Sequence, residues 1–187
     1  MRVIGYAEAD LPAGPARQVA ELEARVWPGS TPGHDPALDP RTMLLVDAAG
    51  TVTAALSLLY KPIPLADRTY RAAGLSSVAA LPELRGRGLG GRLVAAARAE
   101  LAADPDVDLA LFSCDRPLAA FYEAAGFEVL PGTVLVGGTP EDPLATDEPG
   151  FDKVVLAAFF TDDPGRDRAA FTGVRVPLHP GNTDRLW

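Results

Sequence analysis

The chain has 187 residues, of which 48% are apolar and 22% charged, a composition that suits a globular domain with a sizeable hydrophobic core. Its formal net charge of −8 argues against nucleic acid as the main partner, because binding to a phosphate backbone needs a basic surface. The same negative charge is compatible with a cationic substrate such as an amine.

Signals for a cellular compartment are few. The single cysteine, Cys114, excludes an intramolecular disulfide. The N-terminus reaches the acidic Glu8 too early for a secretory signal peptide, and the longest strongly apolar run, residues 154–160, is far too short to span a bilayer. We therefore expect a cytoplasmic protein with no membrane partner.

Hydrophobic periodicity and turn residues divide the chain into alternating elements without an internal repeat or linker. The first part of the chain is predicted to form a strand at residues 2–8, a helix at 15–27, a loop at 28–41, a hairpin of strands at 43–46 and 51–60, and an extended segment at 68–81. The middle part is predicted to form a helix at 89–102, a strand at 109–113 and a short helix at 117–125. The last part is predicted to form an interrupted strand at 127–136, a loop at 137–150, a strand at 151–160 and a polar, turn-rich tail in which residues 174–178 are extended.

Single residues refine this prediction. The segment Lys61–Pro64 contains two prolines and is expected to break the hairpin's second strand. Gly74 is expected to mark a bulge or a close approach of the backbone. Asp115 is a candidate N-cap for the short helix, and Gly126 fits the position just after its end.

The most informative stretch runs from Leu81 to Leu93. Four glycines in six residues are flanked there by three arginines, after an apolar strand and before a helix. Such a turn exposes backbone N–H groups at a helix N-terminus and so favours phosphate. Gly86-x-Gly88-x-x-Gly91 also fits a dinucleotide fingerprint, but that motif should follow the first strand of a parallel unit, and the strands here are expected to be antiparallel.

A second pattern fits the same stretch better. Arg85-x-x-Gly88-x-Gly90, preceded by Val78-x-x-x-Pro82, resembles the acetyl-CoA pyrophosphate loop of the GNAT superfamily of N-acetyltransferases. A later block, Phe121-Tyr122-Glu123-Ala124-Ala125-Gly126-Phe127, resembles the segment that carries a tyrosine near the cofactor sulfur in those enzymes. Together, the two blocks make the resemblance specific.

The resemblance implies a fold, a cofactor and a reaction. The fold would be α+β, with a mixed, mostly antiparallel central sheet whose central strands splay apart, flanked by helices, in a single domain over residues 1–187. Acetyl-CoA would be the donor for direct transfer of acetyl to a primary amine, with no metal. Tyr122 would be the general acid that protonates the leaving thiolate. Binding of the donor is assigned to Val78, Ala79 and Ala80 beside the pantetheine arm, and to Arg85, Gly86, Arg87, Gly88, Leu89 and Gly90 at the pyrophosphate.

The general base is not evident from the sequence. GNAT enzymes often carry a glutamate on the strand before the loop, but here that stretch reads Leu75-Ser76-Ser77. Glu83 is interpreted as solvated and Asp115 as a helix cap. His34 is interpreted as a surface histidine, and Cys114 as a small buried residue rather than a nucleophile.

The layout is most similar to the aminoglycoside 2′-N-acetyltransferases, which share the acidic loop after the tyrosine helix and a tail that ends in an acid and a tryptophan. The implied acceptor residues here are Ser30, Ser76, Ser113, Asp184 and Trp187. Serines stand at two places where those enzymes carry carboxylates for a polycationic substrate, so the resemblance favours an amine in general over an aminoglycoside.

Three alternatives remain open from the sequence. The acceptor could be a small amine metabolite, an amino acid or a peptide N-terminus. The domain could instead bind coenzyme A without turnover, and a dinucleotide reading would require NAD(H) to raise the melting temperature. Exchange of a strand or of the tail would give a homodimer.

Overall fold

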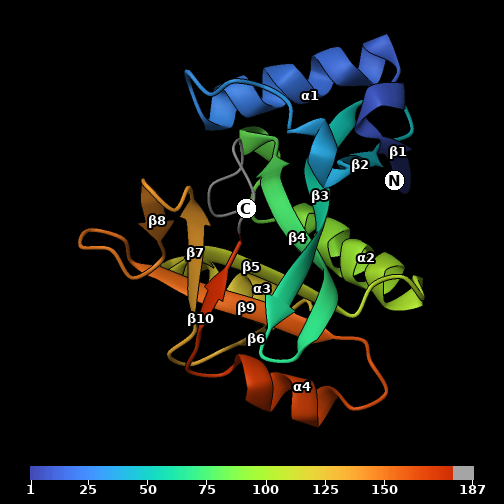
Figure 1. Cartoon of the computed structure of the whole chain (residues 1–187). Coiled ribbons are helices and arrows are strands. Elements are labelled where there is room, and N and C mark those ends of the chain that lie inside the picture. Colours follow the sequence, from blue (N-terminus) through green and yellow to red (C-terminus); the bar gives the residue numbers. More distant parts are fainter. Residues whose placement is uncertain (179–187) are drawn as a thin grey trace.

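The computed structural model describes residues 1–178 as a long twisted sheet with helices on its faces and a small second sheet beside it (Figure 1). The α-helices are α1 (Ala13–Val26), α2 (Leu89–Ala103), α3 (Ala119–Glu123) and α4 (Pro164–Phe171). The strands are β1 (Arg2–Ala7), β2 (Arg41–Val46), β3 (Val52–Leu65), β4 (Arg68–Ala80), β5 (Leu109–Asp115), β6 (Glu128–Val129), β7 (Val134–Gly138), β8 (Pro143–Ala145), β9 (Lys153–Phe159) and β10 (Arg175–Pro177).

The strand order of the main sheet is β1-β2-β3-β4-β5-β9-β6, and every neighbouring pair in it except β4 and β5 is antiparallel. The second sheet has the order β10-β7-β8. The predicted α+β class with a mixed, mostly antiparallel sheet is therefore confirmed.

Helices cover both faces of the first half of the sheet. Leu44 of β2 packs with Leu22 of α1, whereas its neighbour Met43 belongs to the cluster that contains Leu93 of α2. Successive residues of a strand point to opposite faces, so a strand covered on both sides is apolar throughout. This explains the continuous apolar run of β2, whose residues 42–46 are all buried.

The two central strands separate along their length. Parallel pairing of β4 with β5 is confined to Ala72 with Leu109 and Ala73 with Ala110. Beyond these pairs β4 continues to Ala80 beside β3 alone, and β5 continues beside β9. The predicted splay is confirmed, and it opens a gap between β4 and the elements that follow β5.

The predicted break at Lys61–Pro64 is wrong, because β3 runs through it to Leu65. Pro62 pairs with Arg71 and Pro64 with Thr69, both on β4. On its other side β3 has already left β2, whose last pair is Arg41 with Leu58. Proline is tolerated at such an edge, since no neighbouring strand requires its missing N–H.

The bulge predicted at Gly74 lies further along the same strand. Gly74 pairs regularly with Leu59, and the register shifts between Ala55 and Ser57. Ser77 adopts a left-handed φ of 51° at this shift. Such a conformation is costly for a residue with a side chain and is typical of functional sites.

The second half of the chain departs more from its prediction. The interrupted strand at 127–136 is two strands, β6 and β7, which belong to different sheets, and the predicted loop at 137–150 contains β8. The polar tail also contains a helix that the sequence analysis missed, α4. It begins where Asp163 caps the backbone N–H of Arg166 and Pro164 fixes the first turn.

Asp167 of α4 is only 3% exposed, and its side chain connects the helix to the sheet through hydrogen bonds. Its carboxylate accepts hydrogen bonds from Tyr70 at 3.1 Å and Arg68 at 3.2 Å, and a further one from the hydroxyl of Thr161.

We expect Asp167→Ala to lower the free energy of unfolding by about 3 kcal/mol. This value is at the low end for a broken buried ion pair, because Arg68 is partly exposed. Urea unfolding measures this, with exposed Asp162→Ala as the matched control. Equal stability of the two variants would contradict it.

Candidate active site

A cavity of about 650 Å³ occupies the gap between β4 and α3. One wall is the end of β4 and the glycine-rich turn, and the other is the start of the tyrosine helix. Its lining residues are Val26, Trp27, Val78, Ala79, Ala80, Leu84, Arg85, Gly86, Gly88, Leu89, Gly90, Gly91, Leu118, Phe121 and Tyr122. The structure thus brings together Tyr122 and every residue predicted to bind the donor except Arg87, which is exposed and does not line the cavity.

The glycine-rich turn has the conformation of an anion site. Gly86 and Gly88 have φ values of 76° and 73°, a region in which glycine carries no steric penalty. α2 begins directly after Gly88, without a side-chain cap and without an acid in its first turn. The first N–H groups of a helix have no partner within it. Those of α2 are therefore placed to bind a phosphate at the mouth of the cavity.

Gly90 has a packing role as well. A Cβ atom at this position would lie 3.3 Å from Cζ of Phe121 on α3. The absence of a side chain therefore lets α2 approach α3 closely. Gly90 and Phe121 both line the cavity, so this approach brings its wall at the turn next to its wall at α3.

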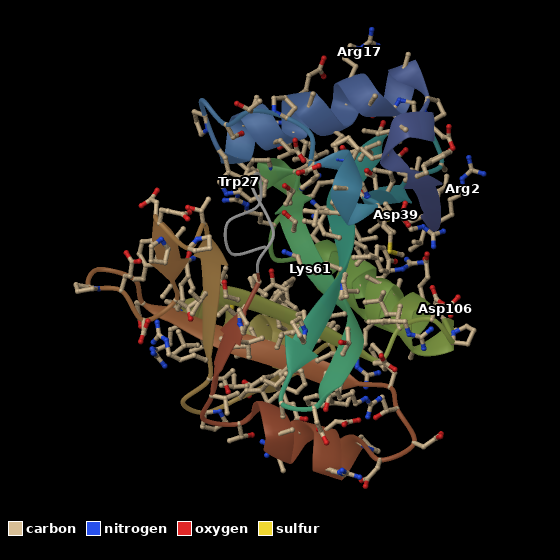
Figure 2. All side chains as sticks on the ribbon, viewed as in Figure 1. Arg2, Arg17, Trp27, Asp39, Lys61 and Asp106 are labelled. Carbon is tan, nitrogen blue, oxygen red and sulfur yellow. The ribbon has the colours of Figure 1, made fainter. Side chains whose placement is uncertain are left out.

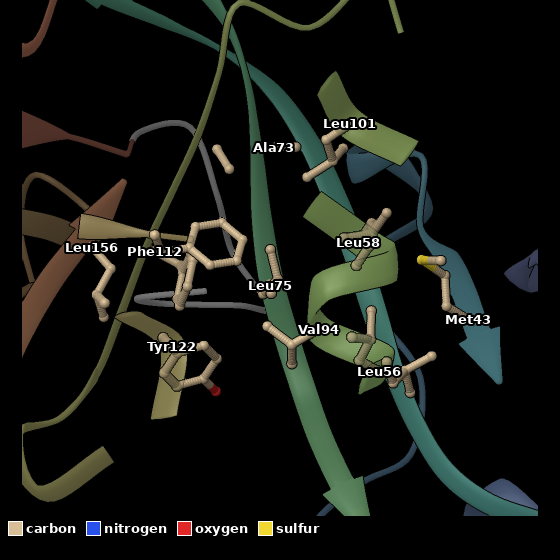
Figure 3. Close-up of a cluster of buried hydrophobic side chains, with 14 of the residues drawn as sticks. Met43, Leu56, Leu58, Ala73, Leu75, Val94, Leu101, Phe112, Tyr122 and Leu156 are labelled. Atoms are coloured by element: carbon tan, nitrogen blue, oxygen red, sulfur yellow. The ribbon is translucent and has the colours of Figure 1, made fainter. Parts of the chain in front are cut away.

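Tyr122 is positioned by aromatic packing. Its ring is in edge contact with Phe112 at 5.0 Å and with Phe121 at 4.9 Å between centroids. Figure 3 shows Tyr122 beside Phe112 in the core, with its hydroxyl at the end that points away from that ring. Burial raises the pKa of Tyr122, and the nearby Cys114 and Asp115 raise it further. The phenol therefore keeps its proton throughout the neutral pH range.

The structure locates the acids and the thiol considered as alternatives. Glu83 is exposed and forms a two-pronged pair with Arg25, which lowers the pKa of its carboxyl. Asp115 makes no cap and instead pairs with Lys153 at 2.9 Å, so its prediction as an N-cap is wrong. Burial raises the pKa of Cys114 to about 11, which disfavours the thiolate that a nucleophile needs.

A smaller cavity of about 200 Å³ adjoins the first. It is lined by Glu23, Trp27, Ser30, Thr31, Gly33, His34 and Ser77. Trp27 lines both cavities, and Ser77 of the smaller one directly precedes Val78 of the larger. Figure 2 shows Trp27 at the end of α1, near the end of β4. The two cavities therefore meet at the bulge of β4.

His34 is not the surface histidine that the sequence suggested, because its side chain is only 5% exposed. Its Nδ1 lies 2.7 Å from Oε2 of Glu8, and its Nε2 lies 3.1 Å from Oγ of Ser76. Because proline and glycine surround His34, its sequence context predicted an exposed loop and not a buried, hydrogen-bonded side chain. The partner, Glu8, follows the first strand, 26 residues earlier in the chain.

The structure places only some of the predicted acceptor residues at or next to the smaller cavity. Ser30 lines the smaller cavity and Ser76 contacts His34. Ser113 lies on β5 opposite Val155 and lines neither cavity. Asp184 and Trp187 lie outside the described residues. Glu23 and Trp27 were not singled out from the sequence, because an acid and an aromatic near a helix end carry no signal of their own.

Another cavity, of about 600 Å³, lies at the opposite end of β4 and is lined by charged residues. Two of its three arginines are already paired, Arg68 with Asp108 and Asp167, and Arg71 with Asp106 and Asp108. Within residues 1–178 there is no cluster of three or more potential metal ligands. No helix in that range is long and apolar enough to cross a membrane.

Comparison with known proteins decides the family. The model of the acetyltransferase (GNAT) domain matches residues 12–130, more than half of the chain. The chain belongs to the GNAT acetyltransferase family. The fold, the cavity and the family model thus agree that this GNAT protein is an acetyltransferase. No protein among the curated sequences compared matches it significantly.

Solved structures support the GNAT fold. Escherichia coli ElaA superposes with a TM-score of 0.61 at 16% identity, covering 83% of this chain and 97% of that one. The GNAT family N-acetyltransferase YhbS of Escherichia coli, in complex with CoA, gives 0.60 at 18% identity, covering 96% and 91%. An aminoglycoside 6′-N-acetyltransferase complexed with coenzyme A gives 0.56 at 14% identity, covering 88% and 99%.

Proposed function

We propose that this GNAT protein transfers acetyl from acetyl-CoA directly to a primary amine. The observation that carries the proposal is the larger cavity, which unites an uncapped helix N-terminus, the end of β4 where it no longer pairs with β5, and the hydroxyl-bearing ring of Tyr122. A phosphate site, an extended backbone edge and a proton donor are what a thioester of coenzyme A requires. YhbS and the aminoglycoside 6′-N-acetyltransferase were both solved with coenzyme A, which supports the choice of donor.

Different residues would bind different parts of acetyl-CoA. The N–H groups at Gly88–Gly90 would bind the pyrophosphate, and Arg85, which lines the cavity, would add a charge-assisted contact. The β4 backbone at Val78–Ala80 has no β5 partner, so it can pair with the pantetheine amides like an added strand. A backbone N–H of this segment would also stabilise the oxyanion as the amine attacks the thioester carbonyl.

Tyr122 would act on the departing sulfur. Because burial raises its pKa, full transfer of its proton to a thiolate is uphill, since an ordinary thiol has a pKa near ~8.5. A hydrogen bond to the developing negative charge carries no such cost. We therefore propose that Tyr122 stabilises the thiolate chiefly by donating a hydrogen bond to it as the C–S bond breaks.

The acceptor would be a small primary amine or one ring of an aminosugar. Glu23 lines the smaller cavity and Glu8 lies behind His34 of its wall, and these two acids favour a cation. Its volume of about 200 Å³ lies below the range of roughly 300–1,000 Å³ that is usual for drug-sized ligands. A whole aminoglycoside would therefore have to present a single ring. The similarity in layout to the aminoglycoside 2′-N-acetyltransferases supports an aminosugar among the candidates.

A panel assay tests this proposal. Purified protein is mixed with acetyl-CoA and, separately, with glucosamine, kanamycin, putrescine, tyramine, glycine and an alanyl peptide, and thiol release is followed. Release with glucosamine or kanamycin supports an aminosugar, and release with the other amines supports a metabolite, amino acid or peptide acceptor. Binding of coenzyme A without release from any acceptor would overturn the proposed activity and favour a non-catalytic domain. A rise in melting temperature with NAD(H) alone would overturn the donor.

A further inference from the structure

Three residues from distant parts of the chain form a hydrogen-bonded line that ends at the bulge of β4. Glu8 lies in η1 (Glu8–Asp10), His34 in the loop after α1, and Ser76 on β4. The carboxylate of Glu8 contacts Nδ1 of His34 at 2.7 Å, and Nε2 of the same ring contacts Oγ of Ser76 at 3.1 Å. The donor site described above uses none of these three side chains.

The donors and acceptors of this hydrogen-bonded line determine the direction in which it can carry a proton. A carboxylate can only accept hydrogen bonds, so Nδ1 of His34 carries the proton that Glu8 receives. In a neutral imidazole Nε2 is then the acceptor, and the hydroxyl of Ser76 is its donor. An oxygen that gives its own proton to an imidazole can accept one from a further group. The line is thus oriented to carry a proton from Ser76 toward Glu8.

The surroundings hold His34 in this orientation. The second carboxylate oxygen of Glu8 accepts the backbone N–H of His34 at 3.0 Å, so one acid fixes both the ring and the loop. Gly33 lies close above the same carboxylate, where a Cβ atom would be 3.6 Å from Oε1. The carboxylate of the adjacent Asp35 is turned away and accepts the N–H of Ala37. His34 therefore faces Glu8, Ser76 and, across the smaller cavity, Glu23.

The end of the line lies where the acceptor must react. Ser76 is half-buried, whereas the imidazole behind it is almost completely covered. Ser77, the next residue, lines the smaller cavity and leads into Val78 of the larger. His34 also lines the smaller cavity, so an amine there would lie beside His34 and Ser77, next to Ser76, which itself lines neither cavity.

We propose that Ser76, His34 and Glu8 form the proton relay that deprotonates the acceptor amine. This inference rests on the proposed acetyl transfer. The ammonium group gives a proton to Oγ of Ser76 as Ser76 gives its own to Nε2 of His34, and Glu8 stabilises the resulting imidazolium. The neutral nitrogen then forms the C–N bond, and the C–S bond breaks with its electron pair going to sulfur, which leaves as a thiolate hydrogen-bonded to Tyr122. The second proton that the nitrogen loses ends on this thiolate and gives free coenzyme A. His34 returns its proton to solvent after each turnover.

The relay explains how the chain functions without a carboxylate on β4. At neutral pH an alkylamine is almost entirely protonated, since its pKa resembles the ~10.4 of lysine. Only the neutral form has a lone pair for attack. Glu23, whose pKa is raised mainly by burial, lies across the cavity and would help to hold the ammonium group before its proton is lost.

The test compares Ser76→Ala, His34→Gln and Glu8→Gln with the wild type, using an acceptor that the panel identifies. A general base typically contributes about 10²–10⁴-fold, so we expect kcat at pH 7 to fall by a factor in that range. The loss should shrink as the pH rises toward the pKa of the amine, because solvent then supplies the neutral form. Ser57→Ala, on the residue paired with Ser76, and exposed Asp10→Asn are the matched controls.

A pair of amines separates proton transfer from positioning of the loop. Ethylamine is protonated at pH 7, and 2,2,2-trifluoroethylamine of nearly the same shape is neutral. The relay predicts a large loss in the variants with ethylamine and a small one with the fluorinated amine. Equal losses with both, or a loss that does not change with pH, would overturn the relay and leave the proposed activity intact. No thiol release by the wild type with any amine would overturn both.

Discussion

Tyr122→Phe is expected to retain the fold and the affinity for acetyl-CoA but to lose roughly 10²-fold or more in kcat. The ring remains packed against Phe112 and Phe121, because the substitution removes only the hydroxyl. The missing oxygen would leave the departing thiolate without its hydrogen bond. Steady-state thiol release measures kcat, and calorimetric titration with coenzyme A measures binding.

The control for this variant is Tyr60→Phe. Tyr60 is also a phenol within the fold, and burial raises its pKa to about 12, yet it lines a different cavity, together with Arg41 and Lys61. Each substitution removes a single hydroxyl, that of Tyr60 being bonded to Arg41, and only Tyr122→Phe should lose kcat. If Tyr122→Phe turned over as fast as the wild type, Tyr122 would be a packing residue only.

Gly88→Ala is expected to weaken binding of coenzyme A by roughly 5- to 30-fold. A side chain in the left-handed region costs about 1–2 kcal/mol, and the exposed turn can relieve this strain by changing conformation. The change would turn the N–H groups before α2 away from the pyrophosphate. Nothing lies within 4 Å of a Cβ atom at Gly88, so the effect comes from the backbone and not from a clash.

Gly50→Ala is a closely matched control for that variant. Gly50 has a φ of 86° in the turn between β2 and β3, and a Cβ atom there also meets open space. Both variants should lose similar stability in thermal unfolding, but only Gly88→Ala should weaken the calorimetric affinity for coenzyme A. Equal affinities in the two variants would show that the turn at Gly88 does not hold the donor.

The proposed donor site could be predicted from the sequence because its signals are local. A run of glycines and arginines between a strand and a helix specifies a turn whose N–H groups point outward, whatever the rest of the chain does. The tyrosine helix was likewise recognisable within seven consecutive residues, 121–127. Local sequence does not determine which arginine of the turn lines the cavity, and the structure places Arg85 there but not Arg87.

The acceptor side could not be predicted in the same way. Glu8, His34 and Ser76 are separated by 26 and 42 residues and come from three different elements. His34 stands in a proline- and glycine-rich segment, where a surface position is the usual expectation. α4 was missed for a similar reason, because its polar sequence becomes a helix through a cap at Asp163 and a buried anchor at Asp167.

The sequence by itself determined the family, the proposed donor loop and most of the strands, because short-range periodicity and turn chemistry act between near neighbours. Only the tertiary structure decided where the two cavities meet and which groups surround the smaller one, the proposed acceptor cavity. The bulge at Ser77, the contact between α1 and β4, and the pairing of His34 with Glu8 depend on long-range packing. Such contacts exist only once the sheet has brought its separate segments together.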